Sequence, residues 1–194
     1  MGCCLITLIF CVTETDLIDK LLAKDENAFG VLIKQHQKQI YKVCMGFLHD
    51  KQEAEDITQD VFLEGFKSIH YFKQTSSLST WLYRIAVNKS LNHLKRQKVK
   101  QLYVTLQGLV GITHTQANSH EILELKEQKS ELAKAIATLP ENQRIAFTLA
   151  KYDELSYEEI AEIMSVSLSS VESLLFRAKA NLKKRLQKYY ENYF

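Results

Sequence analysis

The sequence predicts an all-α protein with two small helical domains joined by a flexible linker. One proline and six glycines among 194 residues leave few turn formers, whereas a many-stranded β fold needs turns at short intervals. Apolar residues recur at intervals of three and four over most of the chain, as they do in amphipathic helices. Between about 101 and 120 this periodicity fails, and Gly, Thr, Asn and Ser residues indicate a linker.

The apolar pattern also sets the expected element and domain boundaries. Before the linker, helices are expected over 16–23, 29–48, 54–69 and 78–94, with turn-forming residues at 73–77. After it, Pro140 suits the first turn of a fresh helix. The expected divisions are an N-terminal extension over 1–14, a helical domain over 15–100, a linker over 101–120 and a second helical domain over 121–190.

The extension is apolar and uncharged from Gly2 to Val12, but it is too short to span a bilayer. It lacks the positive flank of a signal peptide, and Ile6 stands where N-myristoylation requires Ser or Thr. Bacterial genes sometimes start at codons that otherwise encode valine, so Val12 is our preferred start of translation. A disordered apolar tail and a membrane anchor are the alternatives.

Cysteine usage and charge narrow the class of protein. Cys3, Cys4, Cys11 and Cys44 show neither a disulfide framework nor zinc-site spacing, which favours a reduced, cytoplasmic protein without a metal. Net charge is only +2, but cations cluster without acids at 89–100 and 177–188, and acids cluster without cations at 53–64. This distribution suggests two surfaces for a polyanion and one for a basic protein, the alternative being solvated helix faces.

The C-terminal domain carries a helix-turn-helix pattern. Ser156 and Glu159 form a capping box, Ser167 is a second N-cap, and Val166 in the turn between them is expected to fill the gap between helices. The second helix of such a unit enters the DNA major groove, and the cations that begin at Arg177 favour phosphate contact. A plain three-helix bundle is the alternative.

The stretch 139–144, followed by 155–164 and Val171, resembles the C-terminal module of extracytoplasmic-function (ECF) sigma factors, which binds the upstream (minus thirty-five) promoter element. The resemblance implies phosphate contacts from Lys151, Ser156 and Tyr157. The other residues expected at this element are Ser169, Ser170, Glu172, Ser173, Arg177 and Lys179.

Two positions in this module depart from the family pattern. Glu172 and Leu174 stand where relatives usually have cations. A carboxylate can accept a hydrogen bond from cytosine N4 but repels phosphate, so we expect an altered promoter preference.

The acidic stretch 53–63 is similar to the polymerase-binding helix of the same family. In that family this surface contacts the clamp helices of the largest polymerase subunit, and a solvated acidic face is the alternative. The residues implied in polymerase binding are Glu53, Glu55, Asp56, Gln59 and Asp60.

The stretch 79–96 resembles the promoter-melting helix of the family. Asn88, Asn92 and Lys95 are spaced to share one helix face, with Arg96 on the neighbouring face, so amides for base edges lie beside cations for phosphate. Trp81 is expected in the core. By resemblance, the loop 73–78 helps a pocket to take one flipped-out base, and that pocket is formed by Ser68, Phe72, Tyr83, Ile85 and Asn88.

Together the two modules imply a sigma factor that binds core RNA polymerase and directs promoter recognition, melting and transcription initiation. The implied partners are core RNA polymerase, promoter DNA and an anti-sigma factor, with no small-molecule substrate, cofactor or catalytic residue. Two alternatives remain: a helix-turn-helix regulator that binds duplex DNA as a dimer, and a helical hydrolase. The sequence has no paired carboxylates or Ser/His/Asp order that would support the hydrolase.

Overall fold

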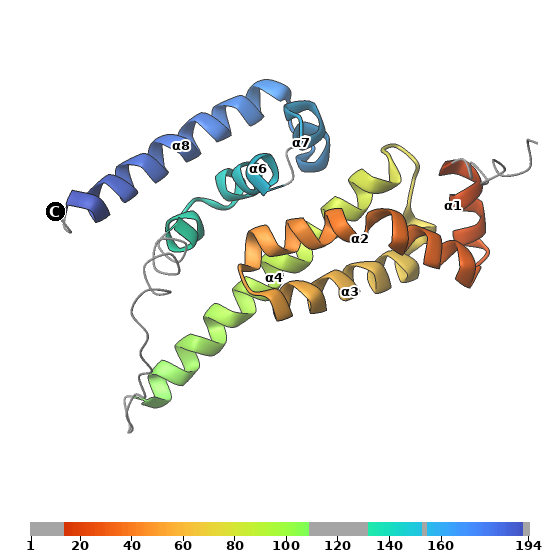
Figure 1. Ribbon diagram of the computed structural model, residues 1–194, viewed down its shortest axis with the longest axis horizontal. Coiled ribbons are helices and arrows are strands. Elements are labelled where there is room, and N and C mark those ends of the chain that lie inside the picture. Colours follow the sequence, from red (N-terminus) through yellow and green to blue (C-terminus); the bar gives the residue numbers. More distant parts are fainter. Residues whose placement is uncertain (1–13, 109–131, 153–154, 192–194) are drawn as a thin grey trace, which may run out of the picture.

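The computed structural model describes residues 14–108, 132–152 and 155–191, and in these ranges all regular structure is helical (Figure 1). The all-α prediction is therefore confirmed. The N-terminal helices are α1 (Glu14–Leu22), α2 (Glu26–Leu48), α3 (Lys51–Ser68), the short 3₁₀ helix η1 (Ile69–Tyr71) and α4 (Leu78–Gly108). The C-terminal ones are a helix over 132–137, α6 (Glu141–Tyr152), α7 (Tyr157–Met164) and α8 (Leu168–Glu191).

Local capping explains why α2 and α3 begin and end where they do. The Asp25 carboxylate accepts a hydrogen bond from Asn27 N at 2.8 Å, and Asp50 accepts one from Glu53 N at 2.9 Å. Between the two helices His49 takes a left-handed conformation, with φ 56°, and its N–H donates to Met45 O. This turn reverses the chain, so α3 lies against α2.

Helices α2, α3 and α4 form the core of the N-terminal domain. Leu32, Val43, Val61 and Leu82 are fully buried among them. Helix α1 packs against α2 and η1, and the Glu14 carboxylate accepts a hydrogen bond from Leu78 N at the start of α4. The N-terminal helix thus fixes the entry to α4.

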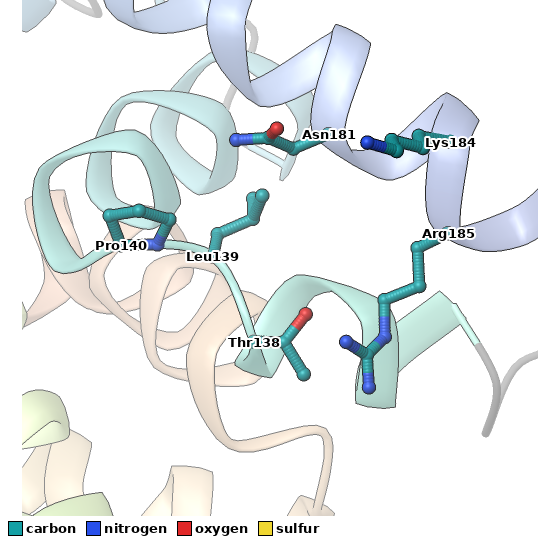
Figure 2. Close-up of a pocket in the computed structure, with 6 residues that line it drawn as sticks. All are labelled: Thr138, Leu139, Pro140, Asn181, Lys184 and Arg185. Atoms are coloured by element: carbon teal, nitrogen blue, oxygen red, sulfur yellow. The ribbon is translucent and has the colours of Figure 1, made fainter.

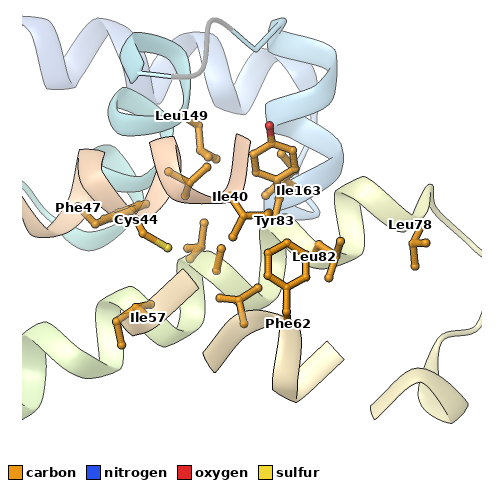
Figure 3. Packing of buried hydrophobic residues seen from close by; sticks show 14 of the residues in the cluster. Ile40, Cys44, Phe47, Ile57, Phe62, Leu78, Leu82, Tyr83, Leu149 and Ile163 are labelled. Atoms are coloured by element: carbon orange, nitrogen blue, oxygen red, sulfur yellow. The ribbon is translucent and has the colours of Figure 1, made fainter. Parts of the chain in front are cut away.

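The C-terminal helices pack against the N-terminal domain through a shared apolar core (Figure 3). Leu149 of α6 and Ile163 of α7 belong to the same buried cluster as Ile40 and Leu82. Arg84 of α4 adds two hydrogen bonds, from Nη2 to Glu162 O at 2.7 Å and from Nε to Ile163 O at 3.3 Å. A positive side chain is favourable at these carbonyls because they lie at the negative end of α7.

The structure differs from the sequence expectations at three points. Helix α4 continues to Gly108, eight residues past the expected end of the first domain at 100. Val166 is 38% exposed, so the expectation that it fills the gap between helices is wrong. Trp81 is half-buried rather than fully in the core. The expected N-terminal extension and the rest of the linker lie outside the described residues, apart from Glu14.

Within the described ranges, none of the helices combines the length and apolar character that a membrane span requires.

Candidate nucleic-acid interface

A hollow of about 460 Å³ runs between α3 and α4, and we call it the α3–α4 groove. Tyr71 and Trp81 line its aromatic end, together with Ser68 and Ile85. Further along α4 its lining residues are Asn88, Lys89, Asn92, His93 and Arg96, and those of α3 are Ile57, Asp60 and Glu64.

The amides proposed to contact bases lie in this groove. Asn88 and Asn92 are exposed and one helical turn apart, and Arg96 lies a further turn along the same wall. Lys95 does not line the groove. Its ammonium forms an ion pair with Glu141 of α6 at 3.0 Å, so in this arrangement it connects the two domains.

Five residues were expected to form the base pocket, and the structure brings three of them together. Ser68, Ile85 and Asn88 line the groove, whereas Tyr83 is only 7% exposed and packs in the core. Phe72 is half-buried and packs on Trp81, with ring centroids 5.2 Å apart.

Sequence reasoning missed Tyr71, which lies at the aromatic end of the groove and is 78% exposed. It lies in a 3₁₀ turn, where helical periodicity gives no signal. The hint in the sequence was an aromatic pair, Tyr71 and Phe72, just before the turn-forming loop 73–77.

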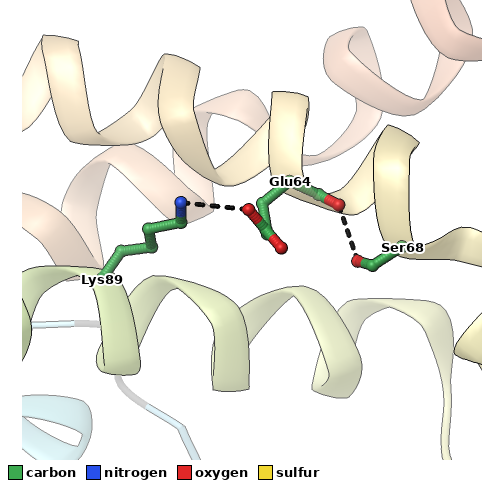
Figure 4. A network of polar contacts seen from close by, with 3 residues as sticks. All are labelled: Glu64, Ser68 and Lys89. Carbon is green, nitrogen blue, oxygen red and sulfur yellow. Dashed lines mark hydrogen bonds and ion pairs between the residues drawn. The ribbon is translucent and has the colours of Figure 1, made fainter.

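The acidic side chains of α3 divide into two groups. Glu64 forms an ion pair with Lys89 of α4 at 3.2 Å, and its backbone carbonyl accepts a hydrogen bond from Ser68 Oγ at 2.6 Å (Figure 4). Glu53 also faces α4, where it contacts His93 at 3.4 Å and accepts a hydrogen bond from Gln97. These carboxylates are therefore engaged within the domain.

The second acidic group faces solvent. Asp56 and Gln59 are exposed on α3 outside the α3–α4 groove, and Leu63 continues the same face with 50% of its surface exposed. Asp60 is exposed too, but it lines the groove. Glu55 is half-buried, lies 3.8 Å from Lys51, and lines a second hollow between α2 and α3 with Gln59. The outward face thus combines carboxylates, an amide and one apolar side chain.

The helix-turn-helix caps form as expected. Ser156 Oγ accepts from Glu159 N at 3.2 Å, and Ser156 N donates to Glu159 Oε2 at 2.8 Å, which completes the capping box of α7. Helix α7 ends at Ser165, in a left-handed conformation with φ 54°. Ser167 Oγ then accepts from Ser170 N at 3.3 Å at the start of α8.

The expected groove-facing residues of α8 are mostly exposed. They are Ser169, Glu172, Ser173, Arg177 and Lys179, while Ser170 is half-buried. Lys151, Ser156 and Tyr157 are also exposed. Leu174 is half-buried and packs against the core, so its side chain is not available to a major groove.

Phe176 is a second exposed aromatic that sequence reasoning missed. Its side chain is 75% exposed beside Glu172, Ser173 and Arg177. The Arg177 guanidinium donates to Ser173 O at 3.1 Å, which holds it along α8.

Two cations of the second basic run lie at a different place. Lys184 and Arg185 line a hollow of about 280 Å³ with Thr138, Leu139 and Pro140 (Figure 2). Asn181, at the same hollow, donates to Gln143 Oε1 at 2.8 Å and ties α8 to α6. Among the described residues, no three His, Cys, Asp or Glu side chains are grouped to hold a metal ion.

Comparisons with known proteins agree with this architecture. The family model for Sigma-70 region 2 matches residues 32–99, and that for Sigma-70, region 4 matches residues 129–182. The RNA polymerase sigma-H factor of Pseudomonas aeruginosa is 32% identical over 181 residues, which cover 90% of this chain and 94% of that protein. The ECF RNA polymerase sigma-E factor of Escherichia coli K12 is 28% identical over 183 residues, covering 91% and 95%.

Solved structures share the fold. CnrH in complex with the cytosolic domain of CnrY superposes with a TM-score of 0.61 at 22% identity, covering 89% of this chain and 96% of that one. The sigma factor RpoE of Bartonella quintana, in complex with the anti-sigma factor NepR, gives a TM-score of 0.56 at 21% identity, covering 82% and 96%. At these identities the likeness concerns the fold alone.

Proposed function

Because the chain belongs to the ECF sigma factors of bacterial RNA polymerase, we propose that it recruits core RNA polymerase to promoters through three separate surfaces. The first is the outward face of α3, the second is the α3–α4 groove, and the third is the exposed face at the start of α8. The chain acts by binding and has no catalytic role of its own.

Core polymerase binds the outward face of α3. Asp56 and Gln59 are exposed there and offer a surface complementary to a basic helix, and Asp60 is exposed on the groove side of α3. Leu63 supplies an apolar contact within this charged face. Glu53 contributes less than its sequence position suggests, because it already contacts His93 and Gln97.

The melted strand of the promoter binds in the α3–α4 groove. The observation that carries this assignment is that Asn88, Asn92 and Arg96 line the same groove as Tyr71 and Trp81. Amides hydrogen-bond to base edges, cations hold phosphate, and aromatic rings stack on unpaired bases. The base pocket proposed here is bounded by Ser68, Ile85 and Asn88, with Trp81 in place of Tyr83.

The upstream element binds the first turns of α8. Ser169, Ser173 and Arg177 are exposed for base and phosphate contacts, and Ser156 and Lys151 lie at the positions proposed for phosphate. Glu172 is also exposed on α8, where it accepts from cytosine N4 and disfavours other bases.

An anti-sigma factor is the proposed regulator. The support is that related folds have been solved with such partners, including RpoE with NepR. The surfaces that it covers are those proposed for polymerase and DNA.

The decisive test is the double substitution Asn88→Ala with Asn92→Ala in holoenzyme assembled from the full chain and core polymerase. We expect open-complex formation, measured by permanganate reactivity of unpaired thymines, to be lost, while affinity for core polymerase is unchanged. Asn142→Ala, at an exposed asparagine of α6, is the matched control.

Loss of polymerase binding together with melting would show that Asn88 and Asn92 are structural. The wider function is tested by in vitro transcription on genomic fragments with mapped start sites. Absence of start sites above background would contradict a sigma factor.

A further inference from the structure

Arg185 is a cation at an inward-facing position of α8. The buried residues of this helix follow one another at intervals of three and four, and they are Val171, Leu175, Ala178 and Leu182. Arg185 is the next position in this series, where an apolar side chain would be usual, because the earlier members pack in the core. Arg185 is instead exposed and lines the hollow between α8 and the start of α6.

This hollow, the α6–α8 hollow, has a volume of about 280 Å³ and is lined by Thr138, Leu139, Pro140, Asn181, Lys184 and Arg185 (Figure 2). Arg185 reaches toward Thr138, and Lys184 extends from the same helix on the side of Asn181. Leu139 is only 6% exposed and provides, with Pro140, an apolar wall. Two cations therefore border an apolar surface.

The two cations of the hollow are not neutralised by the chain. No ion pair among the described residues includes Lys184 or Arg185. Glu141 follows Pro140 directly, but its carboxylate pairs with Lys95 of α4 at 3.0 Å and does not line the hollow. The hollow is therefore electropositive, which favours an anion.

The polar groups of the hollow are mainly hydrogen-bond donors. The Arg185 guanidinium offers a planar fork that matches two oxygens of a phosphate group, and the Lys184 ammonium offers a point charge. The Asn181 amide donates to Gln143 Oε1 at 2.8 Å, which leaves its second N–H for a ligand. The Thr138 hydroxyl already donates to Ala135 O at 2.7 Å.

The hollow is separate from the side of α8 proposed to contact promoter DNA. Successive residues of an α-helix are about 100° apart, so Arg185 lies roughly 160° around α8 from Ser169 and about 24 Å further along it. Ser169 and Ser173 are both exposed near the start of the helix. A duplex bound at these serines leaves the hollow open to another ligand.

We propose that the α6–α8 hollow binds the phosphate groups of a small ligand. Arg185 and Lys184 hold the phosphate oxygens, and Asn181 donates a further hydrogen bond. The volume of about 280 Å³ lies near the lower limit of small-molecule sites, so the ligand is no larger than about a single nucleotide. This site is distinct from the three surfaces proposed for polymerase and promoter DNA.

The test measures binding of ADP and of inorganic pyrophosphate to the full chain by isothermal titration calorimetry. Arg185→Leu will weaken the affinity for both probes by about 10- to 150-fold, the range for loss of a hydrogen bond to a charged group. Leucine continues the apolar series of α8, so the thermal unfolding temperature will not fall. Arg185→Gln removes the charge without adding apolar surface and will show the same loss of affinity.

The matched control is Lys183→Leu, which removes one positive charge from an exposed position of α8 that does not line the hollow. At about 0.15 M salt, charges more than about 8 Å apart are largely screened, so its affinity for both probes will stay close to that of wild type.

The two probes distinguish the sources of phosphate. Tighter binding of ADP, expected because Leu139 and Pro140 contact its apolar part, assigns the site to nucleotides. Equal binding assigns it to inorganic phosphates, and both results support the site. NMR amide shifts on addition of ADP will change at Thr138 and Asn181, whereas those of Ser169 will not.

Binding of both probes weaker than about 1 mM overturns the inference. Equal losses in Arg185→Leu and Lys183→Leu overturn it in favour of unspecific attraction to a basic helix. Amide shifts at Ser169 place the ligand on the DNA side of α8 and also overturn it. A loss of affinity for duplex promoter DNA in Arg185→Leu but not in Lys183→Leu assigns the hollow to the DNA backbone and overturns a small ligand.

Discussion

His36 on α2 is a half-buried titratable group that interacts electrostatically with Glu14 of the N-terminal helix. Burial lowers the pKa of His36 below its ordinary value of 6.5, while a hydrogen bond with Gln39 and the negative charge of Glu14 act in the opposite direction. The Glu14 carboxylate also accepts from Leu78 N, so it acts on both α2 and α4. Two parts of the domain are therefore coupled through one carboxylate.

This coupling predicts the effect of Glu14→Gln on His36. Removing the negative charge will lower the pKa of His36 further, because the protonated form loses a favourable Coulomb interaction. NMR titration of the imidazole protons of His36 measures the change. The amide oxygen of Gln can still accept from Leu78 N, so the fold should be retained; a raised pKa would contradict the prediction.

The direction of stability with pH follows from the lowered pKa. Below pH 6.5 the unfolded chain binds a proton at His36 more strongly than the folded chain does. The contribution of His36 to the free energy of unfolding therefore falls as pH drops below 6.5. It levels off once the pH is below the folded-state pKa.

At the scale of an element, α3 has two functional sides on one helix. Glu53 and Glu64 face α4 and pair with its side chains, whereas Asp56 faces outward and Asp60 lines the α3–α4 groove. In the sequence, all of these carboxylates belong to one acidic stretch, 53–64. The packing of α4 against α3 decides which of these carboxylates remain available to a partner.

This division predicts a selective effect of Asp56→Lys. Placing a cation in the outward face opposes a basic partner, so affinity for core polymerase without DNA should fall by about 10- to 100-fold. Asp19→Lys makes the same charge change on the exposed side of α1 and should leave affinity unchanged. Fluorescence anisotropy of labelled protein measures both, and equal losses would attribute the effect to net charge alone.

Helices α7 and α8 show which structural features can be predicted from neighbouring residues and which cannot. The Ser156–Glu159 capping box and the Ser167 cap formed as the residue types predict, because each involves residues within one helical turn. Val166 and Leu174 were interpreted less well. Their environment is set by the neighbouring helices: Val166 is exposed, and Leu174, which stands where relatives usually have a cation, packs on the core.

At the scale of the whole molecule, the two domains are joined by both apolar and polar contacts. Lys95, proposed from sequence as a DNA contact, pairs with Glu141 at 3.0 Å. The Thr148 hydroxyl is buried and has no hydrogen-bond partner among the described residues, which costs about 1–3 kcal/mol. Thr148 lies against Gly46 of α2, so this cost falls at the contact between the domains.

Gly46 offers a direct test of this domain contact. A Cβ at position 46 would lie 2.8 Å from Thr148 Cγ2 and 2.9 Å from the Tyr152 ring. Gly46→Ala should therefore weaken the contact by about 1–3 kcal/mol, the usual cost of overpacking, and increase the radius of gyration in small-angle X-ray scattering.

The matched control is Gly30→Ala on the same helix. A Cβ there meets nothing within 4 Å, so alanine should stabilise α2 by about 1 kcal/mol without changing the radius of gyration. An unchanged radius in Gly46→Ala would mean that α2 and α6 shift to accommodate the methyl group.

The sequence by itself determined the helical class, the order of the modules and the local caps, because periodicity and capping act within a few residues. It also predicted that Asn88 and Asn92 share one helix face, and both line the α3–α4 groove, whereas Lys95, predicted on the same face, does not. Only the tertiary structure decided that Glu53 is engaged, that Tyr83 is buried and that Tyr71 is exposed at the groove. Those outcomes depend on partners far away in the chain, and helix packing, not spacing, selects them.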